Sequence, residues 1–175
     1  VINNNCLFGY FSGGEQWPVF VTFRKPEDFY AATSLTSTTK SPEKDEFSAK
    51  NYRELVDNPI MYARPDTVQL PIGNTLVTVA CYANSGRKLA PEIAAKIRPL
   101  LEHQRDYLGG TLPVDRYTFI IYHSLHNRPH DYTGDGLEHS ASTLCLFNSA
   151  MDSSLLNTFV YGIASHEFFH IITPL

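Results

Sequence analysis

Several short stretches of the chain alternate apolar and polar residues, which is the period of a β-strand with one buried face. Such alternation runs through residues 17–23, 68–72 and 76–82. The last two stretches flank Gly73 and Asn74, and both residue types tolerate the positive φ of a two-residue hairpin loop. The pattern therefore predicts strands, with a hairpin joining the last two.

The segments between these strands are polar. Residues 34–50 are rich in Ser, Thr, Lys and Glu, which indicates a solvent-exposed loop. Residues 52–56 fit one helical turn, and residues 84–88 form a polar stretch that we interpret as a domain boundary. Residues 1–84 are accordingly predicted to form a β-sandwich domain, which we expect to be incomplete.

Beyond that boundary the apolar period changes to that of an α-helix. Apolar residues recur at helical spacing over residues 91–108, and two consecutive glycines end the pattern. Strands are predicted at residues 117–122 and 144–147, and a last helix with an apolar face begins after residue 152. This order of elements predicts an α+β domain for residues 85–175.

Composition narrows the class of protein. The 175 residues are 43% hydrophobic and 18% charged, as in ordinary globular chains. No apolar run approaches the roughly 20 residues of a membrane-spanning helix. The formal net charge of -4 argues against a nucleic-acid partner, because phosphate binding needs a basic surface.

The three cysteines, Cys6, Cys81 and Cys145, show no C-x-x-C spacing. Neither a disulfide framework nor a thiolate zinc site is therefore indicated. We expect three small core hydrophobes, and one bridge with one free thiol is the alternative.

A group of histidines, His123, His126 and His130, lies among Asn, Arg, Pro and Asp residues. No two of them are four residues apart on a predicted helix, and a proline makes the segment irregular. We therefore interpret them as loop histidines in preference to a second metal site.

The strongest chemical signal is an H-E-x-x-H motif formed by His166, Glu167 and His170. Two imidazoles four residues apart on a helix project from one face and can close on a single zinc ion. Both histidines continue the apolar stripe of Phe159 and Ile163, so we expect them to face the interior. Two core histidines that hydrogen-bond to the backbone are the alternative.

A second motif, G-D-G-L-E-H-S-A-S-T, occupies residues 134–143. By itself, a glycine-flanked acidic turn before a strand is usually just a turn. Together with the H-E-x-x-H motif it suggests an exopeptidase, in which the Glu138 carboxylate lies beside the metal and binds the free α-ammonium of a peptide.

These two motifs, G-L-E-H at residues 136–139 and S-H-E-F-F-H at residues 165–170, resemble those of the glycyl aminopeptidase family of zinc metallopeptidases. The resemblance implies an N-terminal β-sandwich followed by the first part of a thermolysin-like α+β metallopeptidase domain, often with a PDZ domain further on. It also implies a periplasmic or extracellular location, a peptide substrate with a free N-terminus, and a preference for N-terminal Gly or Ala.

The resemblance assigns roles to individual residues. His166 and His170 are the implied zinc ligands, and Glu167 is the implied catalytic base that takes a proton from the attacking water. Glu138 is the implied anchor for the substrate amine. Residues 142–147 are the implied edge strand along which the peptide lies, and the implied substrate-binding residues are Glu138, Gly136, Ser142 and Thr143. Asp135 departs from the family pattern, which usually has Gly there.

The resemblance also implies a third zinc ligand, a Glu on a helix well beyond His170, and a proton donor further downstream. We therefore expect the chain to be a truncated fragment that binds zinc weakly, is inactive alone, and needs the remainder of its catalytic domain as a partner. The alternative from another class is a non-catalytic β-sandwich binding or interaction module, in which the H-E-x-x-H helix serves only for packing.

Overall fold

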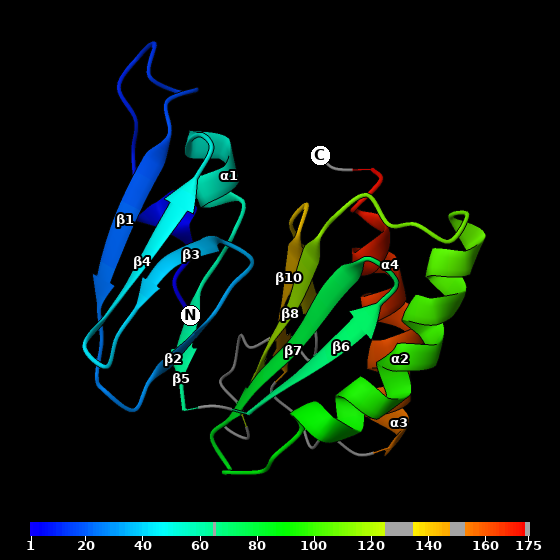
Figure 1. Ribbon diagram of the computed structural model, residues 1–175. Helices are drawn as coiled ribbons and strands as arrows, with labels where there is room; N and C mark the ends of the chain where they lie inside the picture. Colours follow the sequence, from blue (N-terminus) through cyan, green and yellow to red (C-terminus); the bar gives the residue numbers. More distant parts are fainter. Residues whose placement is uncertain (65, 125–134, 148–152, 174–175) are drawn as a thin grey trace. The chain divides into compact units, whose positions relative to one another are not determined.

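The computed structural model of the chain describes residues 1–64, 66–124, 135–147 and 153–173 (Figure 1). The chain divides into two compact units, Val1–Arg64 and Pro65–Leu175. The predicted boundary after residue 84 therefore moves to residue 64. The physical reason is that the hairpin predicted over residues 68–82, which spans residues 67–83 in the structure, hydrogen-bonds to the next strand of the second unit and so belongs to its sheet.

The first unit is built from two small antiparallel sheets and one short helix. Its secondary structure comprises η1 (Asn4–Cys6), β1 (Val19–Arg24), β2 (Tyr30–Ala32), β3 (Thr36–Lys40), β4 (Lys44–Ala49), α1 (Tyr52–Val56) and β5 (Met61–Ala63). The strand order is β1-β4-β3 in one sheet and β2-β5 in the other. One apolar cluster of this unit comprises the buried residues Val21, Ala31, Leu35, Phe47, Ala49, Leu55 and Ile60.

The prediction of an exposed loop at residues 34–50 is wrong, because β3 and β4 occupy most of this segment. In β4, Asp45, Phe47 and Ala49 alternate with more exposed residues, so one face of the strand is buried. Every residue of β3 is exposed, as its position at the sheet edge allows. A solvated edge strand rich in Ser and Thr has the composition of a loop, and that composition misled the prediction.

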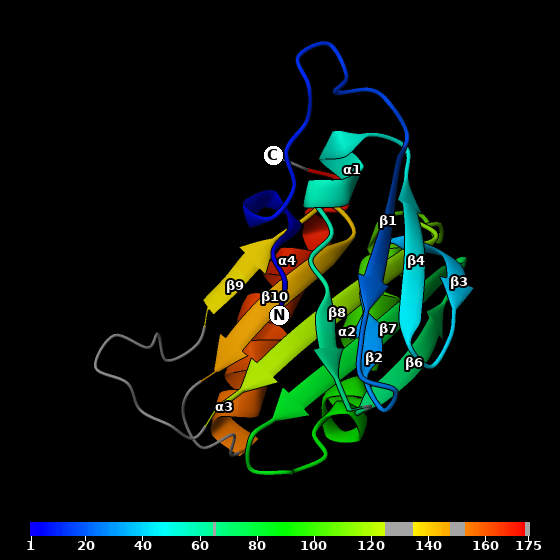
Figure 2. The same ribbon diagram turned by 90° about the vertical axis from the view of Figure 1, so that its left-hand side faces the viewer.

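The second unit is organised by a five-stranded mixed sheet. Its strands are β6 (Thr67–Ile72), β7 (Thr75–Ala83), β8 (Arg116–His123), β9 (Asp135–Glu138) and β10 (Ser142–Phe147). The order across the sheet is β6-β7-β8-β10-β9, which can be followed in Figure 2. The three central strands are parallel, and the two outer strands run antiparallel to them. The predicted hairpin is present, with Gly73 at φ 59°.

The helices of this unit lie on one face of the sheet (Figure 1). They are α2 (Ala90–Tyr107), α3 (Ser153–Thr158), the π-helical stretch η2 (Phe159–Ala164) and α4 (Ser165–Phe169). Gly109 and Gly110 follow α2 with φ of 85° and 90°, which confirms the predicted helix stop. Between helices and sheet lies the larger apolar core, which includes Val79, Ile97, Tyr117, Phe119, Phe147, Phe159 and Phe168.

The last helix is not a uniform α-helix. A π turn accommodates one extra residue, so the residues after it are rotated about the helix axis relative to a continuous α-helix. Phe168 and Glu167 are buried as a result, whereas His166 is exposed and His170 is partly buried. The expectation that both histidines continue the buried stripe of Phe159 is therefore wrong.

These observations establish the predicted α+β fold class. Among the helices in the described parts of the chain, none is both long and apolar enough to cross a bilayer. Cys81 and Cys145 are buried, as predicted for small core hydrophobes, but Cys6 is exposed, and none of the three forms a disulfide.

Candidate metal centre

The two histidines of the H-E-x-x-H motif converge at the end of α4. The Nε2 atoms of His166 and His170 lie 3.3 Å apart. Nδ1 of His170 lies 3.2 Å from the carbonyl oxygen of Thr173. Because a carbonyl can only accept, Nδ1 carries the proton in this contact, and in the neutral ring the Nε2 lone pair points toward His166.

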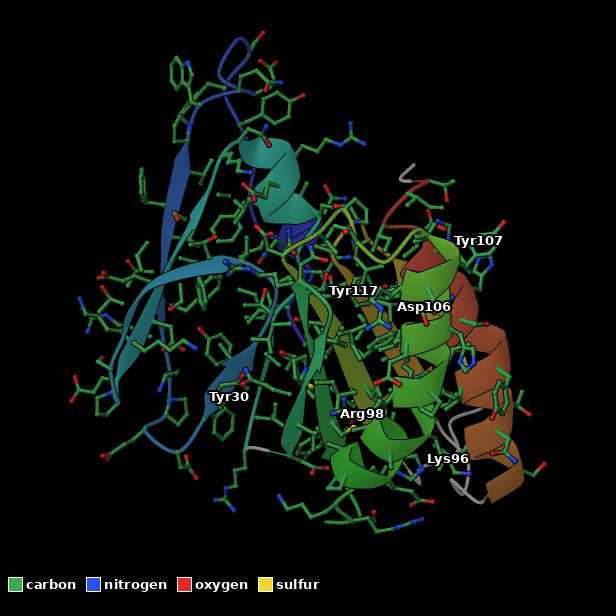
Figure 3. All side chains as sticks on the ribbon, turned by 45° about the vertical axis from the view of Figure 1, so that its right-hand side comes forward. Tyr30, Lys96, Arg98, Asp106, Tyr107 and Tyr117 are labelled. Carbon is green, nitrogen blue, oxygen red and sulfur yellow. The ribbon has the colours of Figure 1, made fainter. Side chains whose placement is uncertain are left out.

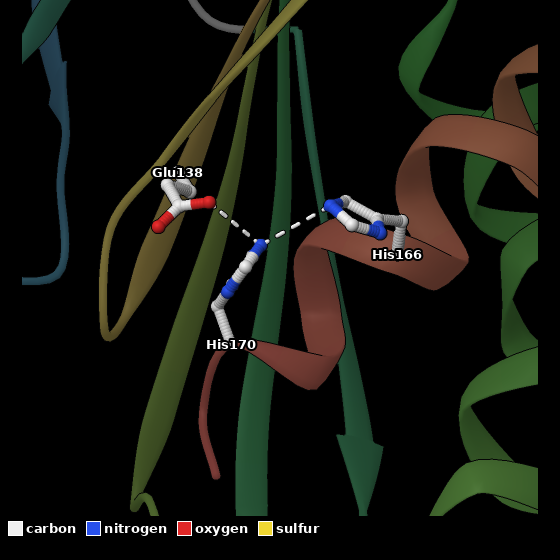
Figure 4. A group of neighbouring side chains, drawn as sticks. All are labelled: Glu138, His166 and His170. Carbon is white, nitrogen blue, oxygen red and sulfur yellow. Dashed lines mark hydrogen bonds and ion pairs between the residues drawn. The ribbon is translucent and has the colours of Figure 1, made fainter. Parts of the chain in front are cut away.

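Glu138, at the end of β9, reaches the same point. Its Oε2 atom lies 2.8 Å from Nε2 of His170 (Figure 4). One ligand atom from each of Glu138, His166 and His170 lies within 4.8 Å of the other two. The side chain of Glu138 is 28% exposed and that of His170 is 14% exposed, so the group lies near the surface and is partly shielded from water.

This donor set fits zinc. Nitrogen ligands lie about 2.0–2.1 Å from zinc, so two of them at a tetrahedral angle are about 3.3–3.4 Å apart. The spacing of 3.3 Å between the histidine nitrogens matches this value. Two imidazole nitrogens and a carboxylate oxygen in such proximity need a proton or a cation between them, and one metal ion satisfies all three.

Glu167 faces away from solvent and is held by the β9–β10 pair. It is 7% exposed, and its Oε2 atom accepts a hydrogen bond from Oγ1 of Thr143 at 3.2 Å. Its other oxygen, Oε1, lies only 2.7 Å from the position that a Cβ on Gly136 would occupy. Gly136 thus leaves the space in which the Glu167 carboxylate sits. We call Gly136, Thr143 and Glu167 the carboxylate cradle.

Register explains why these residues meet. Thr143 of β10 pairs with Glu138 of β9, and directly opposed residues project from the same face of a sheet. Gly136 is two residues before Glu138 and shares that face. The cradle and the Glu138 carboxylate therefore lie on the side of the β9–β10 pair that faces α4.

Contacts outside the motif hold α4 in place. Tyr117 is labelled in Figure 3. Its hydroxyl donates to the backbone carbonyl of Glu167 at 3.0 Å, and its ring packs edge-on against Phe168. The side chain of Gln104 donates to the carbonyl of Ser165 at 2.8 Å. The supporting roles of Tyr117 and Gln104 could not be read from the sequence, since neither motif contains these residues and both contacts span 50 residues or more.

The structure changes the predicted place of the substrate strand. β10 is hydrogen-bonded to β8 on one side and β9 on the other, so residues 142–147 do not form the predicted edge strand. Ser142 and Thr143 are fully buried, and among the described strands β9 is the outer one on this side. An added peptide strand could therefore pair with β9 but not with β10.

The remaining candidates lie elsewhere. Glu138 and Gly136 are both on β9, as their shared motif implies. His123 is buried at the end of β8, so its interpretation as a loop histidine is wrong. His126, His130 and Gly134 lie outside the described residues, so the interpretation of His126 and His130 as loop histidines stays a prediction.

Comparisons with known proteins bear on both units. Residues 1–64 match the family profile of the Peptidase M61 N-terminal domain. An aminopeptidase N family protein from Idiomarina loihiensis aligns with a TM-score of 0.71 at 21% identity, covering 90% of this chain and 27% of that protein. An M1 zinc metallopeptidase from Deinococcus radiodurans aligns with a TM-score of 0.43 at 16% identity, covering 79% of this chain and 32% of that protein. No curated protein sequence matches the chain.

The Idiomarina alignment shows a common fold, and the chain spans about a quarter of the length of that protein. The alignment to the Deinococcus enzyme is too weak to show a common fold. The family match has the same limits as the first compact unit, Val1–Arg64. The first unit is thus similar to the N-terminal domain of M61 peptidases, and the fold as a whole is similar to that of an aminopeptidase N family protein.

Proposed function

We propose that this chain is part of a zinc-dependent aminopeptidase. The observation that carries the proposal is the 3.3 Å spacing of the His166 and His170 Nε2 atoms, which matches two ligands of one tetrahedral zinc ion. The similarity of residues 1–64 to an M61 peptidase domain and the likeness of fold to an aminopeptidase N family protein support it.

In this proposal the residues of the chain have separate roles. His166 and His170 hold the metal, and bound zinc supplies the Lewis acidity that peptide hydrolysis needs at neutral pH. Glu167 acts as the general base, which takes a proton from the attacking water and passes it to the departing amine. Thr143 and Gly136 act as positioning residues, because they fix the carboxylate of Glu167 and leave it only 7% exposed.

Substrate binding follows from the position of β9. A peptide that adds as an outer strand would hydrogen-bond to the β9 backbone, as in other cases of β-strand addition. The Glu138 carboxylate would then pair with the free α-ammonium of the first residue, so that cleavage falls after that residue. The preference for N-terminal Gly or Ala rests only on the sequence resemblance to glycyl aminopeptidases.

Catalysis needs a complete ligand set. A catalytic zinc site usually has three protein ligands and one exchangeable position. The sequence resemblance assigns the third ligand to a Glu beyond His170. We accordingly propose that residues 1–175 by themselves bind zinc without releasing amino acids, and that activity belongs to a polypeptide that adds this ligand.

Zinc binding tests the proposal directly. Calorimetric titration of the metal-free chain should show one zinc per chain, and His166→Ala or His170→Ala should lower the affinity by about 100-fold or more, since loss of an outer-shell partner alone costs 10–100-fold. The control is His103→Ala, which removes an exposed histidine on α2. Unchanged zinc affinity in both motif variants would contradict the metal site.

The catalytic assignment has its own test. In the complete polypeptide that contains residues 1–175, release of the first residue from Ala- and Gly-peptides should require zinc and a free N-terminus. Glu167→Gln keeps the shape of the side chain and removes the base, so we expect at least a 100-fold loss of kcat. Full activity of this variant would overturn the role of Glu167.

A further inference from the structure

We infer that Glu138 is the third protein ligand of the metal in the 175-residue chain. This inference rests on the zinc site of the proposed function and departs from the anchoring role that the sequence assigns to Glu138. Its basis is the position of the Glu138 carboxylate, which contacts Nε2 of His170, the same atom that lies close to His166.

The distances suit a shared metal ion. Oε2 of Glu138 lies 2.8 Å from Nε2 of His170, and no pair among the three ligand atoms is more than 4.8 Å apart. Atoms bound to one zinc ion are about 3.3 Å apart, so the carboxylate oxygen has to shift by roughly 1–2 Å at most. Rotation about the side-chain bonds of Glu138 covers such a shift without movement of β9.

The other carboxylate near the histidines is not available in the same way. Glu167 is adjacent to His166 in sequence, but its Oε2 atom accepts a hydrogen bond from Thr143 and its Oε1 atom lies close to Gly136, within the carboxylate cradle. Glu167 is also absent from the set of residues whose ligand atoms converge, which within the described part of the chain comprises Glu138, His166 and His170. Charge favours a carboxylate as the third ligand, because a carboxylate offsets part of the +2 charge that two neutral imidazoles leave unbalanced.

Coordination and amine binding by Glu138 compete with each other. A carboxylate that is bound to zinc shares its negative charge with the cation, so it attracts an α-ammonium group less strongly. The 175-residue chain would therefore hold zinc tightly while its amine anchor is occupied. A third ligand from elsewhere would free Glu138 for the substrate. The Glu138 side chain would therefore bind the metal when this ligand is missing and the substrate amine when it is present.

Cobalt titration of the metal-free chain tests this inference. Cobalt takes the place of zinc in such sites, and its visible absorption is much stronger in four-coordinate than in six-coordinate geometry. Glu138→Gln keeps the size of the side chain but replaces the carboxylate with a weak ligand. We expect it to lower the cobalt affinity by about 10–100-fold and to weaken the visible band. The matched control is Glu102→Gln, which changes a part-exposed Glu of α2 in the same unit.

The variants separate the two proposals. If His166→Ala lowers the affinity and Glu138→Gln leaves both affinity and spectrum unchanged, the inference about Glu138 is wrong and the histidine site stands. If neither variant changes the affinity, the zinc site itself is wrong. Circular dichroism of each variant shows whether it is folded, and Glu138→His gives a second check, because a new imidazole ligand should restore the band that Glu138→Gln loses.

Discussion

The two units of the chain differ in what they carry. The first unit, Val1–Arg64, matches a peptidase family profile, but none of its described residues belongs to the group that can hold a metal. It has a small apolar cluster, and several of its aromatic side chains are exposed, among them Phe11 at 82% and Phe20 at 75%. The second unit carries the candidate chemistry on a five-stranded sheet with helices against one face.

This difference indicates which structural features a metal site requires. Ligands must be held to within fractions of an ångström, which requires rotamers fixed by packing. In the second unit Phe168, next to the motif residue Glu167, is fully buried against Tyr117 and Phe119. The core thus fixes the chain between the two histidines, whereas none of the described residues of the first unit belongs to a group of converging ligands.

The largest expected effect is removal of this support. Phe168→Ala should destabilise the second unit by about 3–5 kcal/mol and abolish zinc binding, because the ring fills the space beneath α4. Phe47→Ala removes an equally buried ring from the first unit and should leave zinc affinity within about twofold. Zinc titration of both variants makes the comparison.

Unfolding of the two units can be followed separately. Trp17 is the only tryptophan in the sequence and lies in the first unit, whereas the 18-residue α2 makes helical circular dichroism report mainly on the second. During denaturation by urea, Phe47→Ala should shift the fluorescence transition and Phe168→Ala the dichroism transition. Loss of zinc binding in Phe47→Ala would show that the second unit does not hold its site independently.

The next effect concerns the carboxylate cradle. Gly136→Ala would place a methyl group 2.7 Å from Oε1 of Glu167 and 3.1 Å from Ile163, and should cost about 1–3 kcal/mol. Gly162→Ala is the control, because a Cβ there meets no atom within 4 Å and alanine favours the helical backbone. The measurement is the urea midpoint by circular dichroism. Equal midpoints for the two variants would show that Gly136 does not enclose Glu167.

A smaller effect is expected for the hydrogen bond to Glu167. Thr143→Val keeps the shape of the side chain and leaves Oε2 of Glu167 without this donor, at a cost of about 1–3 kcal/mol if no water replaces the hydroxyl. Thr143→Ser keeps the hydroxyl and should retain the position of Glu167. In the complete polypeptide, Thr143→Val should lower kcat more than Thr143→Ser does; the reverse order would contradict a positioning role.

The smallest effect is the response to alkaline pH, which again distinguishes the units. Burial raises the pKa of the Cys81 thiol in the second unit, and burial beside Asp45 raises the pKa of Tyr30 and Tyr62 in the first. A group whose pKa is raised in the folded state stabilises the fold at pH values below its unfolded-state pKa. This stabilisation is lost as the pH rises from the unfolded-state pKa toward the folded-state pKa. The loss should begin near pH 8.5 for Cys81 and near pH 10 for the tyrosines.

At pH 9 a large part of the unfolded-state thiol is ionised, so part of the stability contributed by Cys81 is lost, while the contributions of the two tyrosines are almost unchanged. The dichroism midpoint should therefore fall between pH 8 and 9 while the fluorescence midpoint stays constant. Cys81→Ala should reduce the slope of the dichroism midpoint against pH. An unchanged slope in that variant would exclude Cys81 as its source.

The sequence was informative where one short segment carries the signal. The i, i+4 spacing of His166 and His170 predicted their convergence, and Gly73-Asn74 predicted the hairpin, because both features depend on local backbone geometry. The solvated strand β3 and the π turn before α4 were missed. Their residues have loop-like or helix-like composition, and only the surrounding structure decides between the alternatives.

Long-range features of the site could not be predicted. The contact of Glu138 with His170 and that of Tyr117 with the carbonyl of Glu167 join segments 32 and 50 residues apart, on elements whose relative placement depends on the whole sheet. The edge position of β9 is likewise a property of strand order, which no motif encodes. In the proposed function, the hydrogen bond from Thr143 to Glu167 and the space beside Gly136 make these two residues supports for Glu167 in place of the expected substrate contacts.

The central claim is that one zinc ion is held between the histidines of α4. The most direct measurement is the anomalous difference density at the zinc absorption edge, from crystals of the 175-residue chain grown with one equivalent of zinc. The account predicts one strong peak about 2.0–2.1 Å from Nε2 of both His166 and His170. A peak elsewhere, or contact with only one of these nitrogens, would contradict it.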